Sequence, residues 1–430
     1  MPIDTAAPRP FGYWTATALV MGGMIGSGIF LMPIALAPYG WTGVVGWIVS
    51  IAGVLAIGWT LARLAQHMPE ASGAIAITGA VLGPLPGVMV GVAYWVSVWA
   101  ANAAIALAAT SYLAAFVPAL NATPLTGALV AVALIWLLTL LNLGGAKLAG
   151  RVQVITTILK IAPLIAVVAI AAAVGVGGTV ALPPLPASGM VLAGLGGAVA
   201  LTLFPLVGFE AASVAAERIR DPARTVPRAT MTGIVAVGLF YILVCSGIVL
   251  LLPAADVAAS VAPFQLFVER FAGVGGGLLV AAFAAIAAIG ALNGWVLIQG
   301  EVPLGMARAG LLPRWFAHVS ARDVPVRVLI LSSICASLLV LSNASASLAG
   351  VFAFAALLTT CSSLWFYLAA CVSALVRRIA PVSASFGIAF SLFAFWGAGG
   401  AASGLSLGLM LAGIPLYLLR SRTALPEQPT

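Results

Sequence analysis

The stretch TALVMGGMIGSGIFLMPIALA, residues 17–37, decides the fold because it is apolar enough to cross a bilayer yet is interrupted at its centre. Its middle, GGMIGSG, holds four glycines and a serine, residue types that weaken a helix. Within hydrocarbon, backbone leaves helical geometry only where protein buries it or where it lines a wet cavity. The stretch therefore predicts a discontinuous membrane helix with a functional site at its break.

The composition excludes a soluble globular domain. Apolar residues are 63% of the 430 positions, charged residues are 7%, and the mean hydropathy is +1.20. A helix needs about 20 apolar residues to cross the hydrocarbon, and about twelve stretches meet this condition with little chain left over. We expect an all-α membrane protein in which residues 1–430 form a single transmembrane domain. The expected spans are 13–37, 41–65, 86–116, 124–143, 150–174, 190–216, 229–253, 272–303, 326–342, 346–374, 382–398 and 403–420.

The basic side chains indicate how the chain is oriented in the membrane. If the N-terminus is cytoplasmic and the spans alternate, only Arg270 of the 18 basic residues lies outside and only Lys160 lies deep within a span, while the others lie in cytoplasmic segments or at the cytoplasmic ends of spans. This asymmetry predicts an even number of spans, cytoplasmic N- and C-termini and a place in the cell (inner) membrane. It also explains the net charge of +8 without nucleic acid as a partner. The first residues lack the features of a cleaved secretory signal, so the first span is expected to stay on the chain.

A second span is interrupted at comparable depth. The stretch GGAVALTLFPLVGFEAASVAAE, residues 196–217, carries Pro205 and Gly208 near its centre. Proline removes a backbone donor and glycine lowers the penalty for leaving helical geometry, so this helix is also expected to unwind. The alternative for the first break is that Gly22 and Gly26 allow close helix packing, as in GxxxG dimers.

Two interrupted spans that lie five apart in order indicate inverted repeats of five helices, with a substrate site between the breaks. The first repeat is expected over about 13–174 and the second over about 190–374. The last two helices, about 382–420, lie outside the repeat. The expected architecture is thus a 5+5 inverted repeat in which helices 1 and 6 are broken.

A broken helix offers backbone N–H groups at the positive end of one half and carbonyls at the negative end of the other. An amino acid carries both complementary charges, so a zwitterion or an amine is a better substrate for such a site than a sugar. Its carboxylate is expected on the amides around Gly26, Ser27 and Gly28, with the Ser27 hydroxyl as an added donor. Its ammonium is expected to meet carbonyls of the second break, near Phe204, Pro205 and Val207.

Two ionisable residues lie in apolar spans. Glu210 is the only acid deep in its stretch, and such a residue is a functional candidate whose protonation can be linked to substrate occupancy. The alternative is a structural carboxylate that accepts hydrogen bonds from the unwound backbone. Lys160 is a lone cation about ten residues into the fifth span. It either snorkels to the cytoplasmic interface or faces the first and eighth spans as a fixed or titratable positive charge.

Three further polar or aromatic residues have two readings each. Asn102 can bond a polar substrate tail and Trp295 can lie over a cationic or apolar one, but helix–helix bonding or interfacial anchoring is the more common role of either type. Glu301 either joins a proton path to the cytoplasm or marks the membrane exit.

Three motifs resemble those of one transporter superfamily. They are GGMIGSGIFLMP (22–33), YWVSVWAANAA (94–104) and VGFEAASVAAERIRDPARTVPRAT (207–230). On these motifs the chain is similar over nearly its whole length to the amino acid–polyamine–organocation superfamily, which shares the inverted-repeat fold of sodium-coupled leucine transporters. Within that superfamily it looks most like the bacterial arginine/agmatine antiporters.

The resemblance implies roles for the substrate contacts. Ser27 and Gly28 match the serine-glycine motif that holds the substrate carboxylate, and Met24 lines the same pocket. Asn102 matches an asparagine that contacts the guanidinium tail. Trp295 matches a tryptophan that takes part in both binding and gating.

The resemblance also implies roles in gating and coupling, with two departures. Glu210 matches a glutamate implicated in pH sensing, and Tyr94 matches a tyrosine of the outer gate. Phe204 stands where the antiporters have a gating tryptophan that stacks on the guanidinium, and phenylalanine is the weaker cation partner. Together with Val98 and Met24, Phe204 counts slightly against strict arginine selectivity. Lys160 resembles a lysine of other members, in which the ammonium replaces a sodium ion, so sodium coupling is not expected.

The sequence therefore predicts a secondary transporter of amino acids or their amines that works by alternating access, with proton symport or exchange as the coupling. The alternatives are a strict arginine/agmatine antiporter and a channel or non-transporting sensor on the same scaffold. An intramembrane enzyme lacks a nucleophile with a base, because His67 and His318 both lie at cytoplasmic edges. No cofactor or metal is expected, since the four cysteines lack ligand spacing. The expected partners are an amino acid or amine, the lipid bilayer and, as an option, a second copy in a homodimer.

Overall fold

The computed structural model describes residues 11–26, 28–68, 73–144, 159–178, 180–185, 188–214, 219–343 and 345–420. Within these residues every regular element is a helix, and the sole β contact is an isolated parallel bridge between Phe11 and Ile219. The α-helices are α1 (Tyr13–Met24), α2 (Gly28–Leu36), α3 (Trp41–His67), α4 (Gly73–Leu82), α5 (Pro84–Ala114), α6 (Pro124–Leu143), α8 (Ala162–Gly177), α9 (Ser188–Leu203), α10 (Ala211–Val214), α11 (Pro222–Leu251), α12 (Ala254–Ala259), α13 (Pro263–Arg308), α14 (Val326–Ser342), α15 (Leu348–Val376), α16 (Pro381–Leu411) and α17 (Gly413–Leu418). Short 3-10 helices are η1 (Ala37–Tyr39), η2 (Pro118–Asn121), η3 (Phe204–Leu206) and η5 (Arg314–Ala317).

Proline sets the start of five of the long helices. Pro84, Pro124, Pro222, Pro263 and Pro381 each open one, at a position where the missing N–H would have no partner within the helix. The expected spans 86–116, 124–143 and 382–398 therefore begin within two residues of a real helix start, whereas α13 begins nine residues before its expected span and α11 seven residues before its own. There the helix includes part of an Arg- and Pro-rich segment that hydropathy alone assigns to a loop.

In the described part of the chain, 7 helices are long and apolar enough to cross a membrane, or 8 if α1 and Gly28–Tyr39 are counted as one span bent by 49°. Shorter apolar helices are Ala162–Gly177, Gly194–Leu206 and Val326–Ser342. The chain is therefore an all-helical, multi-pass membrane protein. The number of twelve spans and the 5+5 repeat stay predictions. The expected spans 382–398 and 403–420 meet within α16 at Gly399, whose φ of +80° interrupts the helix.

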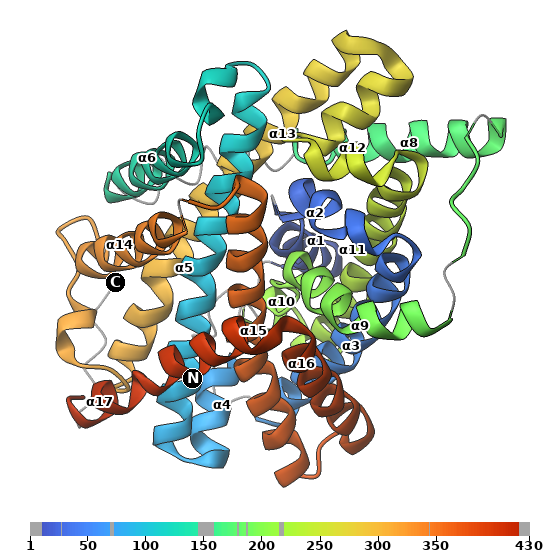
Figure 1. The fold of residues 1–430 in the computed structure, drawn as a ribbon. Coiled ribbons are helices and arrows are strands. Elements are labelled where there is room, and N and C mark those ends of the chain that lie inside the picture. The colour runs from blue at the N-terminus through green and yellow to red at the C-terminus, as the bar shows by residue number, and fades with distance from the viewer. Residues whose placement is uncertain are drawn as a thin grey trace.

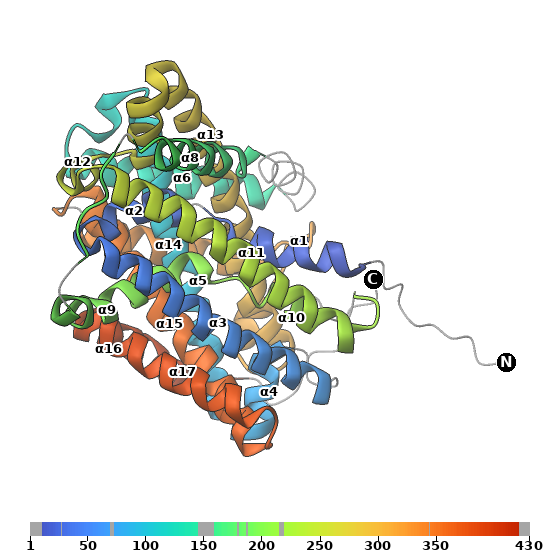
Figure 2. The same ribbon diagram turned by 90° about the vertical axis from the view of Figure 1, so that its right-hand side faces the viewer.

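The centre of the structure is α5, which packs mainly against α15 and α13. Figure 1 shows α5 running through the middle of the bundle beside α15. The window of α5 that would cross a membrane is 89% buried, so this helix is apolar all round because protein, rather than lipid, surrounds it. Figure 2 shows α3, α11 and α16 running side by side, with α3 in contact with both neighbours.

The two interrupted stretches lie together although they are far apart in the sequence. In Figure 1, α1 and α2 lie beside α9 and α10, and contacts join α1 to α10 and α2 to α9. This arrangement brings the break between α1 and α2 against the break between α9 and α10.

Candidate functional site

Both breaks leave helical geometry as their residues predict. The first helix ends at Met24, and Ile25 has a ψ of 81° that no helix accommodates. In the second, α9 passes into η3, whose Pro205 removes a backbone donor, and Val207 is extended. Gly208 has a φ of +106°, a conformation that side chains with a Cβ rarely adopt.

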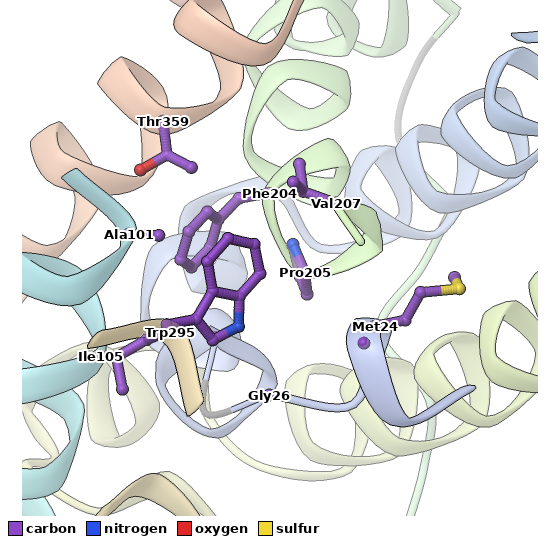
Figure 3. A pocket seen from close by; sticks show the side chains of 11 residues that line it. Met24, Gly26, Ala101, Ile105, Phe204, Pro205, Val207, Trp295 and Thr359 are labelled. Carbon is purple, nitrogen blue, oxygen red and sulfur yellow. The ribbon is translucent and has the colours of Figure 1, made fainter. Parts of the chain in front are cut away.

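A small cavity lies between the two breaks, with walls from α5, α13 and α15 (Figure 3). Its volume, measured as the space open to the centre of a water molecule, is about 20 Å³. This volume has room for about one ordered water. In the observed conformation the cavity is therefore too small to hold an amino acid. Its lining residues are Gly23, Met24, Gly26, Gly28, Ala101, Ile105, Phe204, Pro205, Val207, Trp295 and Thr359.

The structure thus brings together most of the residues expected to bind substrate. Seven of them line the cavity: Met24, Gly26, Gly28, Phe204, Pro205, Val207 and Trp295. Ser27 lies outside the described residues. Val98 and Asn102 are fully buried on α5 but do not line the cavity. Reasoning from sequence did not find Gly23, Ala101, Ile105 and Thr359, although Ala101 and Ile105 flank Asn102 on the same helix.

Two aromatic side chains form part of the cavity wall. Figure 3 shows the Phe204 ring and the Trp295 indole projecting into it from η3 and α13. Phe204 lies directly on Gly28, where a Cβ would stand 2.6 Å from the ring carbon Cε1. The Phe204 ring also meets Phe352 edge to face, at 5.9 Å between centroids. These rings fill the space that a substrate would need.

Side chains from distant parts of the chain bond the carbonyls at the end of α1. The Lys160 ammonium donates to the carbonyl of Gly22 at 2.8 Å, and the Tyr241 hydroxyl donates to the carbonyl of Met24 at 2.8 Å. Lys160 is 5% exposed. Of its two expected arrangements, the structure therefore shows the inward one, with a buried positive charge at the negative end of a half-helix.

The Glu210 carboxylate accepts three hydrogen bonds. Tyr94 donates its hydroxyl to Oε1 at 2.9 Å, Tyr367 donates its hydroxyl to Oε2 at 3.1 Å, and the N–H of Gly208 donates to Oε2 at 3.1 Å. The carboxylate joins the second break to α5 and α15, and it does not line the cavity. The carboxylate accepts a hydrogen bond from the unwound backbone, as expected if Glu210 has a structural role. It also accepts one from Tyr94, the residue expected in the outer gate. Tyr367 gave no signal in the sequence.

Asn102 is turned towards another helix. Its Nδ2 donates to Oε1 of Gln299 on α13 at 2.7 Å. Glu301, one of the undecided residues, is exposed near the end of α13. Among the described residues no group of three His, Cys, Asp or Glu side chains could hold a metal ion.

Comparison with known proteins identifies the family. The family described as Amino acid permease matches residues 11–415, which is nearly the whole chain. The chain belongs to this family. The permease is therefore a membrane transporter rather than an enzyme, and the superfamily resemblance seen in its motifs is confirmed.

Similar proteins include three bacterial transporters. The permease is 30% identical over 329 residues to a cadaverine/lysine antiporter of Escherichia coli (strain K12), with 76% of this chain and 74% of that protein covered. It is 26% identical over 356 residues to the putrescine transporter PotE of the same organism, with 81% and 80% covered. The putrescine transporter PotE of Haemophilus influenzae is 26% identical over 344 residues, with 80% and 79% covered.

Proposed function

We propose that this permease exchanges a basic amino acid for an amine across the cell (inner) membrane by alternating access. The observation that carries the proposal is the cavity at the junction of two broken helices, where Gly28 at the start of α2 and Phe204, Pro205 and Val207 of the second break line one space. The similarity to a cadaverine/lysine antiporter and to putrescine transporters supports cationic amines as the substrate class.

The two ends of a basic amino acid fit different parts of the cavity. The carboxylate binds at the start of α2, where Gly28 is the first helical residue and helix N–H groups lack partners within the helix. In the observed conformation the Gly26 N–H donates to the Met24 carbonyl at 2.7 Å. Substrate binding therefore loosens this turn. The cationic tail lies against the faces of Phe204 and Trp295.

Gating follows from the size of the cavity. The cavity has room for about one water, so the side chains of Phe204 and Trp295 turn aside when substrate enters. They return to their observed positions once the substrate is enclosed. Tyr94 contributes through Glu210, since this hydrogen bond holds α5 to the second break. Opening on that side breaks the bond.

Sodium independence follows from Lys160. Its ammonium donates a hydrogen bond to the carbonyl of Gly22 near the end of α1. Carbonyls at such a break are the groups that coordinate a cation in a broken membrane helix. A bound cation beside this ammonium would be repelled. Both termini are cytoplasmic in this proposal, as the basic residues predict, and the mechanism is the same for a monomer and a homodimer.

Proteoliposomes test the proposal. Uptake of labelled lysine is measured into vesicles that contain lysine, cadaverine, putrescine, arginine, agmatine, leucine or buffer alone, with and without sodium and a pH gradient. We expect uptake only against an internal basic amino acid or amine, and no effect of sodium. Uptake into empty vesicles driven by a pH gradient alone would establish symport instead. Activity restricted to arginine and agmatine would establish the strict antiporter, and no movement of any amino acid or amine would refute the proposal.

A further inference from the structure

A row of buried polar side chains lies behind the cavity wall and crosses four helices. Asn102 on α5 donates its Nδ2 to Oε1 of Gln299 on α13 at 2.7 Å. Gln299 donates its Nε2 to the hydroxyl of Ser333 on α14 at 2.9 Å, and this hydroxyl meets that of Thr139 on α6 at 2.7 Å. All four residues are 0% exposed. Such a row is costly in a membrane interior unless its members are bonded in a fixed arrangement.

The row begins next to the cavity on two helices. Ala101, the residue before Asn102, lines the cavity. Trp295, which also lines it, lies one helical turn before Gln299 on the same face of α13. The Asn102–Gln299 pair therefore lies beside these two lining residues, along the same two helices and outside the cavity in the observed conformation.

The serine at the far end sets the direction of the hydrogen bonds. The Ser333 hydroxyl donates to the carbonyl of Leu329 one turn earlier in α14, at 2.8 Å. It can then only accept from Gln299, which must offer Nε2. The Oε1 of Gln299 consequently faces Asn102, and Asn102 must offer its own Nδ2 in return.

This direction determines which Asn102 atom is left for a ligand. Its Oδ1 is buried, and no hydrogen-bond donor reaches it from the described part of the chain. A buried acceptor without a donor discriminates strongly between ligands, because a ligand that brings an N–H satisfies it and a ligand with an apolar tail does not.

We propose that Gln299 is a positioning residue that determines substrate specificity. It holds the Asn102 amide with its oxygen towards the substrate, so the site accepts from an alkylammonium or guanidinium tail and rejects a neutral tail of the same length. This inference rests on the proposed transport of cationic amines and adds the residue that sets the preference for a cationic tail.

The test is a double-mutant cycle in proteoliposomes, with lysine and cadaverine as substrates and norleucine, a neutral analogue of lysine, as competitor. Gln299→Met keeps the side-chain volume and removes the amide. We expect it to raise the KM for lysine and cadaverine about tenfold with a smaller effect on kcat, and to leave inhibition by norleucine unchanged. In an Asn102→Ala background the same change should raise the lysine KM less than about twofold, because Gln299 then has no amide to orient.

Two further variants separate positioning from packing. Ser333→Ala removes the acceptor that orients Gln299 and should raise the lysine KM, as Gln299→Met does. If Gln299→Met does not fold, Ser333→Ala takes its place in the comparison with the unmodified permease. Ser337→Ala, the matched control, loses a buried hydrogen bond to the Ser333 carbonyl on the same helix and should leave the KM unchanged.

Three results would overturn the inference. They are an unchanged lysine KM in Gln299→Met, an equal loss for lysine and norleucine, and an undiminished effect in the Asn102→Ala background. If the unmodified permease moves no amino acid or amine, the proposed function falls and this inference with it. If the unmodified permease exchanges lysine and Gln299→Met keeps the same selectivity for lysine over norleucine, the proposed function stands and only this inference is refuted.

Discussion

Gly23 and Gly208 face one another across the two helix breaks with their backbones in contact. A Cβ added to Gly23 would lie 2.7 Å from the carbonyl oxygen of Gly208, and a Cβ added to Gly208 would lie 2.7 Å from the carbonyl oxygen of Gly23. Neither atom is the end of a flexible side chain, so the backbone itself would have to move. The cavity exists because these two glycines let the breaks approach each other.

Gly208→Ala is accordingly expected to destabilise the permease by about 2–5 kcal/mol, the sum of a left-handed backbone penalty and an overpacking penalty. Thermal unfolding of the purified protein in detergent measures this, and lysine exchange should be lost. Gly22→Ala is the matched control, because a Cβ at Gly22 meets nothing within 4 Å. Equal stability of the two variants would show that the contact between the breaks is unimportant.

Lys160→Ala removes the ammonium from the Gly22 carbonyl. A hydrogen bond from a charged group contributes about 1.5–3 kcal/mol, so the initial rate of transport should fall about tenfold or more. Rates with and without a pH gradient, and with and without added sodium, measure the effect. Normal accumulation by the variant would reduce Lys160 to a dispensable residue, and restoration of transport by sodium would show that a cation can replace the ammonium.

Glu210→Gln should flatten the dependence of the exchange rate on pH between mildly acidic and neutral conditions, because a carboxamide neither binds nor releases a proton there. Tyr367→Phe provides the comparison. It removes one donor to the carboxylate but keeps the titratable group, so the rate should fall while the shape of the pH profile persists. An unchanged profile in Glu210→Gln would remove this residue from pH sensing.

Phe204→Trp should shift selectivity towards arginine and agmatine, since the indole is the better partner for a guanidinium. The expected gain in affinity is about fivefold, from a cation–π difference of about 1 kcal/mol. Competition with labelled lysine measures it, and Phe204→Leu, which has no ring, should lower affinity for every cationic substrate. A loss of arginine affinity in Phe204→Trp would show that crowding against Gly28 outweighs the added ring face.

The sequence was sufficient wherever the cause is local. The membrane class follows from composition, and the two breaks follow from glycine and proline placed in apolar stretches, because these residues weaken a helix whatever surrounds them. Pairing of the breaks followed from the spacing of the two interrupted spans, and it led to five of the residues that line the cavity: Gly26, Gly28, Phe204, Pro205 and Val207. Met24 and the role of Trp295 came from the superfamily resemblance.

Only the tertiary structure decided which partner each buried polar side chain has. Asn102 bonds Gln299, and Tyr94 and Tyr367 both bond Glu210, although the sequence places Tyr367 far from either break. In a soluble helix, the apolar stripe tells which face is inward. A membrane helix is apolar both towards lipid and towards its neighbouring helices. Its sequence therefore does not indicate which face is buried against protein. The hydrogen-bond partners of its polar side chains are fixed only when the helices pack.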